Sequence, residues 1–310
     1  MIRKILKWVG IGLGSLIGLA AAGSLIGLAA AALAVAYFSM ESKLNKVYTI
    51  PSETVSVPAS FPADTQGFPR AMISFCQQCH GANLAGQVLN EDFIFGRFIA
   101  PNLTSGKGGI GGQYTDADFV RLLRHGVRPN GKPVIAMPAE LFTHLSAGDL
   151  GDVIAYVKSV PPVDNELPRT FFGPIGRGMV LVGMVPMTVA IPAEGIDHAA
   201  PPPDIKPGVT AEYGKYMAII CTECHGEDFA GGESVSAGVN LTPGGDLATW
   251  TDADFVNTLR TGVTPGGKTL DPEKIPLDSI RQLTDDELKA IWLYLQTLPP
   301  VQNPTPTPAP

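Results

Sequence analysis

The sequence predicts an all-α protein made of two similar halves that follow an apolar N-terminal helix. Three observations support this prediction. No charged residue occurs between Trp8 and Met40. A Cys-x-x-Cys-His motif begins at Cys76 and again at Cys221, and each is followed by a similar series of short helical patterns. With 310 residues, the chain is also long enough for two ordinary domains.

Residues 1–40 are predicted to form a transmembrane anchor. The uncharged stretch exceeds the roughly 20 residues that span a bilayer, and the basic residues Arg3, Lys4 and Lys7 before it favour a cytoplasmic N-terminus. A cleaved signal peptide is the alternative, but its apolar region would be only about 7–15 residues long. We therefore expect a single-pass protein of the cytoplasmic membrane, with the rest of the chain on the periplasmic or extracellular side.

The two Cys-x-x-Cys-His motifs are attachment signals for c-type haem. In such a site, two thioether bonds hold the porphyrin and the histidine binds the iron. One helical turn brings both sulfur atoms within reach of the two vinyl groups of one macrocycle. The sequence therefore predicts two covalently bound c-type haems, attached at Cys76 and Cys79 and at Cys221 and Cys224, with His80 and His225 as axial iron ligands.

Two other uses of cysteine pairs fit the sequence less well. A structural zinc site needs four ligands, and a thioredoxin-like redox pair needs no histidine directly after its second cysteine. Here His-Gly follows both pairs, and the haem interpretation uses all four cysteines of the chain.

The similarity of the two halves extends well beyond the haem motifs. Matching segments occur in the same order in both: Asn102-Leu103-Thr104 and Asn240-Leu241-Thr242, Thr115–Val120 and Thr251–Val256, Leu123–Val127 and Leu259–Val263, and Tyr156–Pro162 and Tyr294–Pro300. Internal repetition of this kind indicates two copies of one structural unit.

Helix boundaries can be placed in both copies. Thr115 and Thr251 have the character of helix N-caps, and Gly126 and Gly262 that of helix ends. A capping box that begins at Thr284 precedes the last apolar helical pattern.

This set of motifs resembles the class I cytochrome c domains of membrane-anchored dihaem and trihaem bacterial cytochromes, including the cytochrome subunits of membrane dehydrogenases. The resemblance implies two tandem class I cytochrome c domains, with the first and last helices of each packed across one another. The expected organisation is an anchor (1–40), an extended linker (41–68), cytochrome c domain 1 (69–164), an interdomain segment (165–209), cytochrome c domain 2 (210–302) and a Pro-rich tail (303–310). Within the interdomain segment, residues 171–191 are expected to form a helix that packs on the haem domains or lies at the membrane surface.

The sixth iron ligand is expected to differ between the two copies. In the domains that the chain resembles it is usually a methionine in a Met-Pro loop before the last helix, which implies Met137 for the first haem. The corresponding residue of the second copy is Ile275, whose side chain cannot bind iron. Three alternatives remain open for the second haem: ligation by Lys274 as a neutral amine, a five-coordinate or water-bound iron covered by Ile275, or a ligand from Met179, Met184, Met187, His198 or another chain.

Four further residues are placed near the haems by the resemblance alone. Asn102 and Asn240 are expected to orient loops near the propionates, and Arg124 and Arg260 to neutralise propionate charge. Helix capping, surface charge and core packing compete equally with these roles.

The expected function is that of a membrane-tethered carrier of single electrons on the outer face of the cytoplasmic membrane, rather than that of an enzyme in its own right. Expected partners are the membrane and other redox proteins, such as a dehydrogenase, a respiratory complex, an oxidase or a soluble cytochrome. The net charge of −7 argues against nucleic acid as a partner. The alternative is a sensor or peroxidase-like protein that binds a small ligand at an open sixth site of the second haem.

Overall fold

The computed structural model describes residues 27–28, 30–62, 65–200, 203, 205–231 and 238–303. Most of the predicted anchor, and the Pro-rich tail after Asn303, lie outside these residues. A helix at the start of the described chain includes residues 30–44. Within the described ranges, no helix combines the length and the apolar character that a membrane crossing requires.

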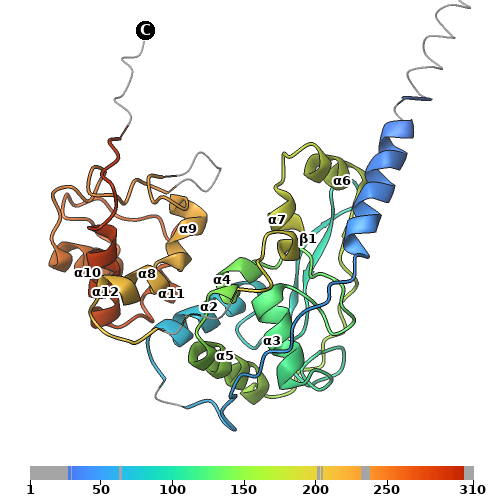
Figure 1. Cartoon of the computed structure of the whole chain (residues 1–310), viewed down its shortest axis with the longest axis horizontal. Coiled ribbons are helices and arrows are strands. Elements are labelled where there is room, and N and C mark those ends of the chain that lie inside the picture. The colour runs from blue at the N-terminus through green and yellow to red at the C-terminus, as the bar shows by residue number, and fades with distance from the viewer. Residues whose placement is uncertain are drawn as a thin grey trace, which may run out of the picture.

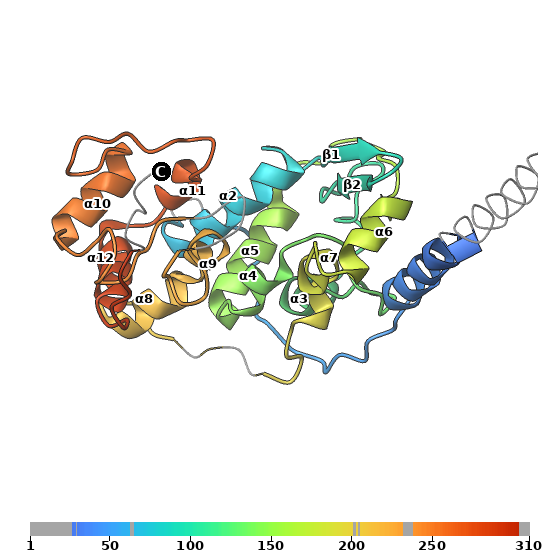
Figure 2. The same cartoon turned by 90° about the horizontal axis from the view of Figure 1, so that it is seen from above.

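The described chain is mainly helical, and the helices of its two halves lie side by side (Figure 1, Figure 2). The first half contains α2 (Phe68–His80), α3 (Asp116–His125), α4 (Ala139–Thr143) and α5 (Ala147–Ser159). The second half contains α8 (Ala211–Met217), α9 (Ile219–His225), α10 (Asp252–Thr261), α11 (Leu277–Ile280) and α12 (Asp285–Leu295). Between them lie α6 (Pro174–Leu181), α7 (Met187–Ala190) and a short 3-10 turn, η1 (Pro192–Glu194).

The helices α3 and α10 begin and end where the repeated sequence predicts. The hydroxyls of Thr115 and Thr251 each accept a hydrogen bond from the backbone N–H three residues later. Gly126 and Gly262 follow the two helices with φ of 62° and 77°, in the left-handed region where glycine avoids a Cβ clash. The capping box at Thr284 begins α12 as predicted. These predictions of helix boundaries are confirmed. They could be made from the sequence because each cap depends only on residues within one helical turn.

The last helix of each half packs against the first. α12 lies against α8, and α5 lies against α2. The crossing of α8 and α12 is close, because a Cβ atom on Gly214 would lie 1.8 Å from the carbonyl oxygen of Ala290. Only glycine fits at this position, and the packing agrees with the helix arrangement that the resemblance implies.

A small antiparallel sheet departs from the all-α prediction. β1 (Gln87–Asp92) and β2 (Gly96–Ala100) form a hairpin, and β3 (Phe171–Phe172) pairs with β2. The hairpin lies in the connection between Gly86 and Asn102, which is longer than the corresponding connection between Gly231 and Asn240. Its backbone groups are satisfied by strand pairing instead of helical hydrogen bonds. The all-α prediction is therefore wrong for this part of the chain.

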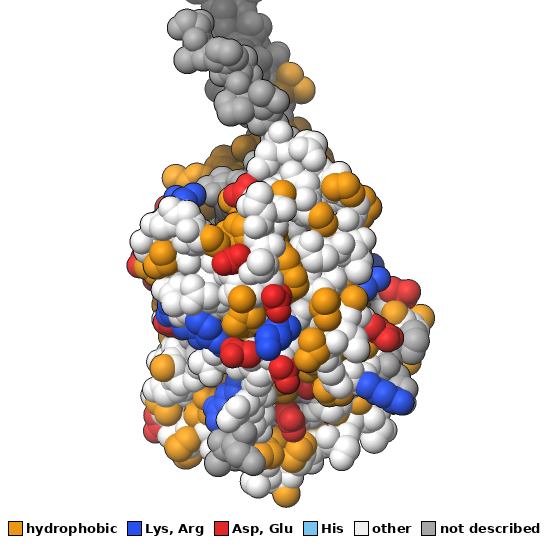
Figure 3. Space-filling model, turned by 90° about the vertical axis from the view of Figure 1, so that its left-hand side faces the viewer, with side chains coloured by type: hydrophobic (Ala, Val, Ile, Leu, Met, Phe, Trp, Pro, Cys, Tyr) orange, Lys and Arg blue, Asp and Glu red, His pale blue; other side chains and the backbone are white. Residues whose placement is uncertain are grey.

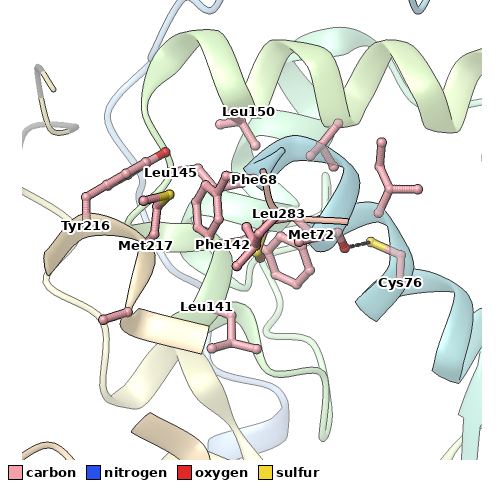
Figure 4. Packing of buried hydrophobic residues seen from close by; sticks show 14 of the residues in the cluster. Phe68, Met72, Cys76, Leu141, Phe142, Leu145, Leu150, Tyr216, Met217 and Leu283 are labelled. Carbon is pink, nitrogen blue, oxygen red and sulfur yellow. Dashed lines mark hydrogen bonds between the residues drawn. The ribbon is translucent and has the colours of Figure 1, made fainter. Parts of the chain in front are cut away.

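One hydrophobic core joins the two halves. Figure 4 shows Tyr216 and Met217 of α8 beside Phe68 of α2 and Phe142 of α4, and all four belong to the same buried cluster. The rings of Phe68 and Tyr216 meet edge to face with their centroids 5.0 Å apart. The Tyr216 hydroxyl also donates a hydrogen bond to Asp149, near the start of α5. The halves thus pack on one another directly, and the interdomain segment is not their only link.

The interdomain segment is broken into short elements instead of one helix. β3, α6 and α7 follow one another, with a turn at residues 182–186 between the two helices. Gly183 takes a φ of 78°, and Pro186 has no backbone N–H to donate, so a continuous helix over residues 171–191 is excluded. Val180 and Ile191 pack with Met40 in a second buried cluster. The segment therefore holds the end of the N-terminal helix against the first half.

The substitution Glu287→Ala is expected to lower the free energy of unfolding by about 2–4 kcal/mol, because it leaves buried donors of both halves without an acceptor. The Glu287 carboxylate is buried and accepts hydrogen bonds from the backbone N–H of Phe68 and from the hydroxyl of Tyr213. Urea unfolding followed by circular dichroism measures the change. The control is Asp118→Ala, which removes the capping-box carboxylate of α3 but no contact between the halves. Equal losses in the two variants would contradict the interpretation.

Candidate functional site

Each Cys-x-x-Cys-His motif forms the C-terminal turn of a helix, α2 in the first half and α9 in the second. His80 is buried, and its Nδ1 lies 2.7 Å from the carbonyl oxygen of Pro101. The Nδ1 of His225 lies 2.6 Å from the carbonyl oxygen of Val239. A carbonyl oxygen can only accept, so both rings donate from Nδ1 and keep the lone pair of Nε2 for a metal ion.

Burial sets the protonation state of the motif residues. It lowers the pKa of His80 and of His225, while the hydrogen bonds to the two carbonyls act in the opposite direction. Both imidazoles are therefore neutral at pH 7, which is the form that binds iron. Burial also raises the pKa of the Cys76 and Cys221 thiols to about 12. A redox-active cysteine pair has a lowered pKa instead, so these thiols do not support the thioredoxin-like alternative.

The loop after each histidine repeats the same backbone conformation. Leu84 and Phe229, each four residues after the histidine, have positive φ of 54° and 58°. The backbone N–H of Leu103 donates to the carbonyl of Leu84 at 2.9 Å, and that of Leu241 donates to the carbonyl of Phe229 at 2.8 Å. Residues other than glycine rarely adopt this conformation. Its presence after both motifs indicates that the two sites require the same backbone turn after the histidine.

Asn102 and Asn240 hold the segment that follows the last helix of their half. The Nδ2 of Asn102 donates to the carbonyl of Val163 at 2.8 Å, and that of Asn240 donates to the carbonyl of Val301 at 2.7 Å. Each Oδ1 accepts from the backbone N–H and the hydroxyl of the threonine two residues later. Sequence reasoning missed this clamp, although the repeated Pro-Pro-Val that supplies its acceptor was visible. The contact with haem propionates stays a prediction.

The side chain of Arg124 forms hydrogen bonds with the backbone at the C-terminal end of α4. Its Nη1 donates to the carbonyl of Thr143 at 2.8 Å and to that of Leu145. Its Nε and Nη2 atoms form a bidentate ion pair with the carboxylate of Glu53 in the linker, and both N–O distances are 3.1 Å. The buried guanidinium thus joins the linker, α3 and the end of α4.

Arg260 plays the same part in the second half. It donates to the carbonyls of Arg281 and Leu283 at 2.9 and 2.6 Å, just after α11. Its ionic partner is Asp285, 2.8 Å away, in place of a linker residue. The structure therefore gives both arginines a role in positioning the short helices, and their contact with propionates stays a prediction.

Met137 and Ile275 occupy equivalent positions. Each precedes a proline at the start of a short helix, and Pro138 and Pro276 have similar ψ of 69° and 59°. The carbonyl of each accepts a hydrogen bond of 2.7 Å from the backbone N–H two residues later. Both side chains are partly buried. The connection from Gly267 to Ile275 is two residues longer than that from Gly131 to Met137, yet Ile275 holds the equivalent place before its short helix. The main chemical difference between the two positions is the side chain.

The other candidates for the second iron lie in different surroundings. The Lys274 side chain is 80% exposed, with its Nζ 3.8 Å from Asp271. The remaining candidates lie in the interdomain segment, where Met184 is exposed, Met187 packs in the second cluster and the Nδ1 of His198 lies 3.2 Å from that of His125. Ligation by Lys274 stays a prediction that requires the ammonium group to leave Asp271 and lose its proton.

The two motifs lie close to one another across the boundary between the halves. Gln78, between the cysteines of the first motif, donates a hydrogen bond of 2.7 Å to Ser279 of α11. Glu223 holds the same place in the second motif, and its charge adds to the effect of burial in raising the pKa of Cys79 and of Glu140 in α4. The motif helix α2 thus approaches α11, the short helix that follows Ile275. The motif helix α9 approaches α4, the short helix that follows Met137.

The surface at the end that carries α10 and α12 mixes both charges, as Figure 3 shows. Several of its charged groups are paired: Arg260 with Asp285, Arg281 with Asp278 and Lys274 with Asp271. Neighbouring opposite charges weaken the electric field at a distance. The described residues of this face therefore form no patch of one sign that would steer a strongly charged partner.

The equivalence of Met137 and Ile275 makes an exchange of the two residues informative. Ile275→Met is expected to raise the reduction potential of the second haem, and Met137→Ile to lower that of the first, each on the order of 0.1 V within the roughly 0.8 V range that axial ligands cover. Spectroelectrochemical titration measures both potentials. Ile280→Met, which adds a thioether elsewhere on α11, should change neither. Unchanged potentials in both exchange variants would show that these positions do not face the iron.

No family model matches the chain. The fructose dehydrogenase cytochrome subunit of Gluconobacter japonicus is 26% identical over 80% of this chain and 55% of its own length. The diheme cytochrome c-type of Cereibacter sphaeroides is 27% identical over 73% of this chain and 83% of its own length. The cytochrome c subunit of an alcohol dehydrogenase (quinone) from Gluconobacter oxydans is 28% identical over 74% of this chain and 54% of its own length.

The chain thus spans about half the length of the dehydrogenase subunits that it matches, and most of the length of the dihaem protein. These similarities confirm the resemblance that the repeated motifs predict. Over most of its length, the chain is similar to a dihaem c-type cytochrome and to the cytochrome subunits of dehydrogenases.

Proposed function

We propose that this protein is a membrane-tethered dihaem c-type cytochrome that carries single electrons between redox partners on the outer face of the cytoplasmic membrane. The observation that carries the proposal is the repeated histidine geometry. In each half the imidazole at the end of the motif helix is neutral and oriented through Nδ1 by a backbone carbonyl. This is the arrangement by which proteins fix a histidine for metal binding.

The proposed ligand set follows from these residues. Cys76 and Cys79 would hold the first haem and Cys221 and Cys224 the second, with His80 and His225 binding the two irons. A bound haem supplies reversible one-electron chemistry, and the protein supplies attachment, orientation and burial. Met137 is the proposed sixth ligand of the first haem, since it holds the Met-Pro position that the resemblance implies, just before α4, whose C-terminal end is bonded to Arg124 of α3. Residues 69–164 and 210–302 are the two proposed haem domains.

The packing of the halves supports electron exchange within the chain. The contact between Gln78 and Ser279, and the shared core around Phe68 and Tyr216, hold the two motifs in one relative position. Packing contacts of this kind fix a separation that a flexible tether would leave variable. The second haem can therefore receive an electron from the first, or pass one to it, without a diffusional step.

The partners are proposed from the names of the similar proteins. Two of them are cytochrome subunits of dehydrogenases, one for fructose and one for alcohol. We infer that a dehydrogenase delivers electrons to this chain, and that an oxidase, another respiratory complex or a soluble cytochrome removes them. The anchor before residue 41 would keep the chain at the membrane where such complexes reside.

Ile275 is the observation that favours a second candidate function. If the second iron has no protein ligand at this position, a small molecule such as carbon monoxide or a peroxide can reach it, as in a sensor or a peroxidase-like protein. The carrier function is favoured because the side chains of Lys274 and Ile275 provide no acid-base pair, and Lys274 is directed to solvent.

The test is a coulometric titration of the purified full-length chain, combined with exposure of the reduced protein to carbon monoxide. A carrier takes up and releases one electron for each haem, exchanges electrons rapidly with an added soluble cytochrome c, and shows no turnover with hydrogen peroxide. Carbon monoxide binding at one haem, together with peroxide turnover that Ile275→Met abolishes, would replace the carrier function with the ligand-binding one.

A further inference from the structure

Exposed apolar side chains gather at one end of the molecule. Of the twenty-one large apolar side chains that are exposed among the described residues, sixteen lie in three segments, residues 28–47, 88–95 and 175–189. These segments are the N-terminal helix with the residues just after it, the β1–β2 hairpin, and α6 with α7. Figures 1 and 2 show that the three meet where the N-terminal helix leaves the rest of the protein. We call this surface the apolar end.

The tip of the hairpin is held rigidly while its side chains face outward. The carboxylate of Asp92 accepts from the backbone N–H groups of Ile94 and Phe95, both at 2.7 Å. The carbonyls of Ile94 and Phe95 accept at 3.0 Å from the backbone at the start of α6, and a Cβ atom on Gly176 would lie 2.0 Å from the Phe95 carbonyl oxygen. Phe93, at the very tip, is 81% exposed. The fold thus fixes the backbone of the tip and leaves its aromatic side chains uncovered.

Arg177 of α6 joins the apolar end to the N-terminal helix. Its buried guanidinium donates to the carbonyl of Tyr37 at 3.1 Å, lies 4.4 Å from the centre of the Tyr37 ring and pairs with Glu41 at 3.2 Å. A groove of about 480 Å³ between the helix and the hairpin is lined mainly by apolar residues, including Leu33 and Phe93. The helix, hairpin and α6 are therefore parts of one continuous surface.

The charge pattern indicates what covers this surface. Glu41 is the first charged residue after the stretch that begins at Trp8, and it lies beside Arg177, at the inner border of the apolar end. No charged residue occurs from Phe93 to Gly96, nor from Gly178 to Ala193. Aromatic and aliphatic side chains beside the exit of an apolar helix are typical of the interfacial layer of a bilayer.

We propose that the hairpin tip around Phe93 and the turn between α6 and α7 lie in the interfacial layer of the lipid bilayer, next to the anchor. The inference rests on the membrane tether of the proposed function and adds a second contact to it. A single helix leaves the attached domains free to rotate over the membrane, whereas contact at two separate points fixes their orientation. The first half, which carries the apolar end, then lies nearer the membrane, and α10 and α12 lie on the far side of the molecule (Figure 1).

The hairpin also explains a difference between the halves. It fills the long connection between Gly86 and Asn102, for which the second half has the shorter connection from Gly231 to Asn240. The addition contributes little to the buried core, since most of its apolar side chains are exposed. A surface role accounts for an insertion that packing alone does not require.

The test uses the full-length chain, loaded with haem, in nanodiscs of phosphatidylethanolamine and phosphatidylglycerol. Photoreactive benzoylphenylalanine replaces Phe93 or Val182 as the test positions, Val35 as a reporter of the anchor, and Val263 as an exposed control on the far half. After illumination, mass spectrometry measures the lipid attached to each variant. An unchanged haem spectrum shows that each variant is folded.

The expected result is lipid attachment at positions 93 and 182 that exceeds the attachment at position 263 by about tenfold or more, with attachment at position 35 as well. Attachment at position 35, with positions 93 and 182 no higher than 263, would overturn the inference and leave the proposed tether intact. Absence of attachment at position 35 would overturn the tether itself, and the inference with it. In native membranes, crosslinks from position 93 to a protein in place of lipid would assign the surface to a partner subunit and also overturn the inference.

Discussion

The rest of the structure depends on the hydrogen bond that fixes the histidine at the end of each motif helix. His80 is held by Pro101 and His225 by Val239, and in both halves the next residue is the asparagine that holds the segment after the last helix. One short segment therefore links the proposed iron-binding imidazole to the residues that follow the last helix. The orientation of the proposed ligand and the packing of its half are consequences of the same contacts.

The two halves share this framework but differ where they meet their surroundings. The first half has the hairpin, the contacts with the N-terminal helix and a methionine before α4; the second has isoleucine before α11 and an end surface of mixed charge. The two halves are therefore suited to different surroundings. We infer that the first half lies toward the membrane and toward membrane partners, and that the second half lies toward partners in solution.

Local signals in the sequence predicted the helix boundaries, because capping at Thr115, Thr251 and Thr284 depends on residues within one turn. The motif residues were also identifiable, since their spacing reflects the size of one macrocycle. The hairpin pairs residues that are close in the chain, but β1 is exposed along almost its whole length and so lacks the alternating apolar pattern that predicts a strand. Only its pairing with β3 joins residues far apart in the chain. The shared core around Tyr216 and the pairing of Arg124 with Glu53 were missed for the same reason, as the sequence does not show which distant groups meet.

In the proposed function, each half carries its own covalently attached haem. Thioether bonds survive denaturation, whereas a haem held only by its iron ligands is lost. The most direct measurement is therefore the mass of the denatured full-length chain, purified from a host with haem-maturation machinery. We expect the mass of the polypeptide plus two haems, reduced to one haem when Cys76 and Cys79 are both replaced by serine. A wild-type mass with one haem or none would contradict the proposed function.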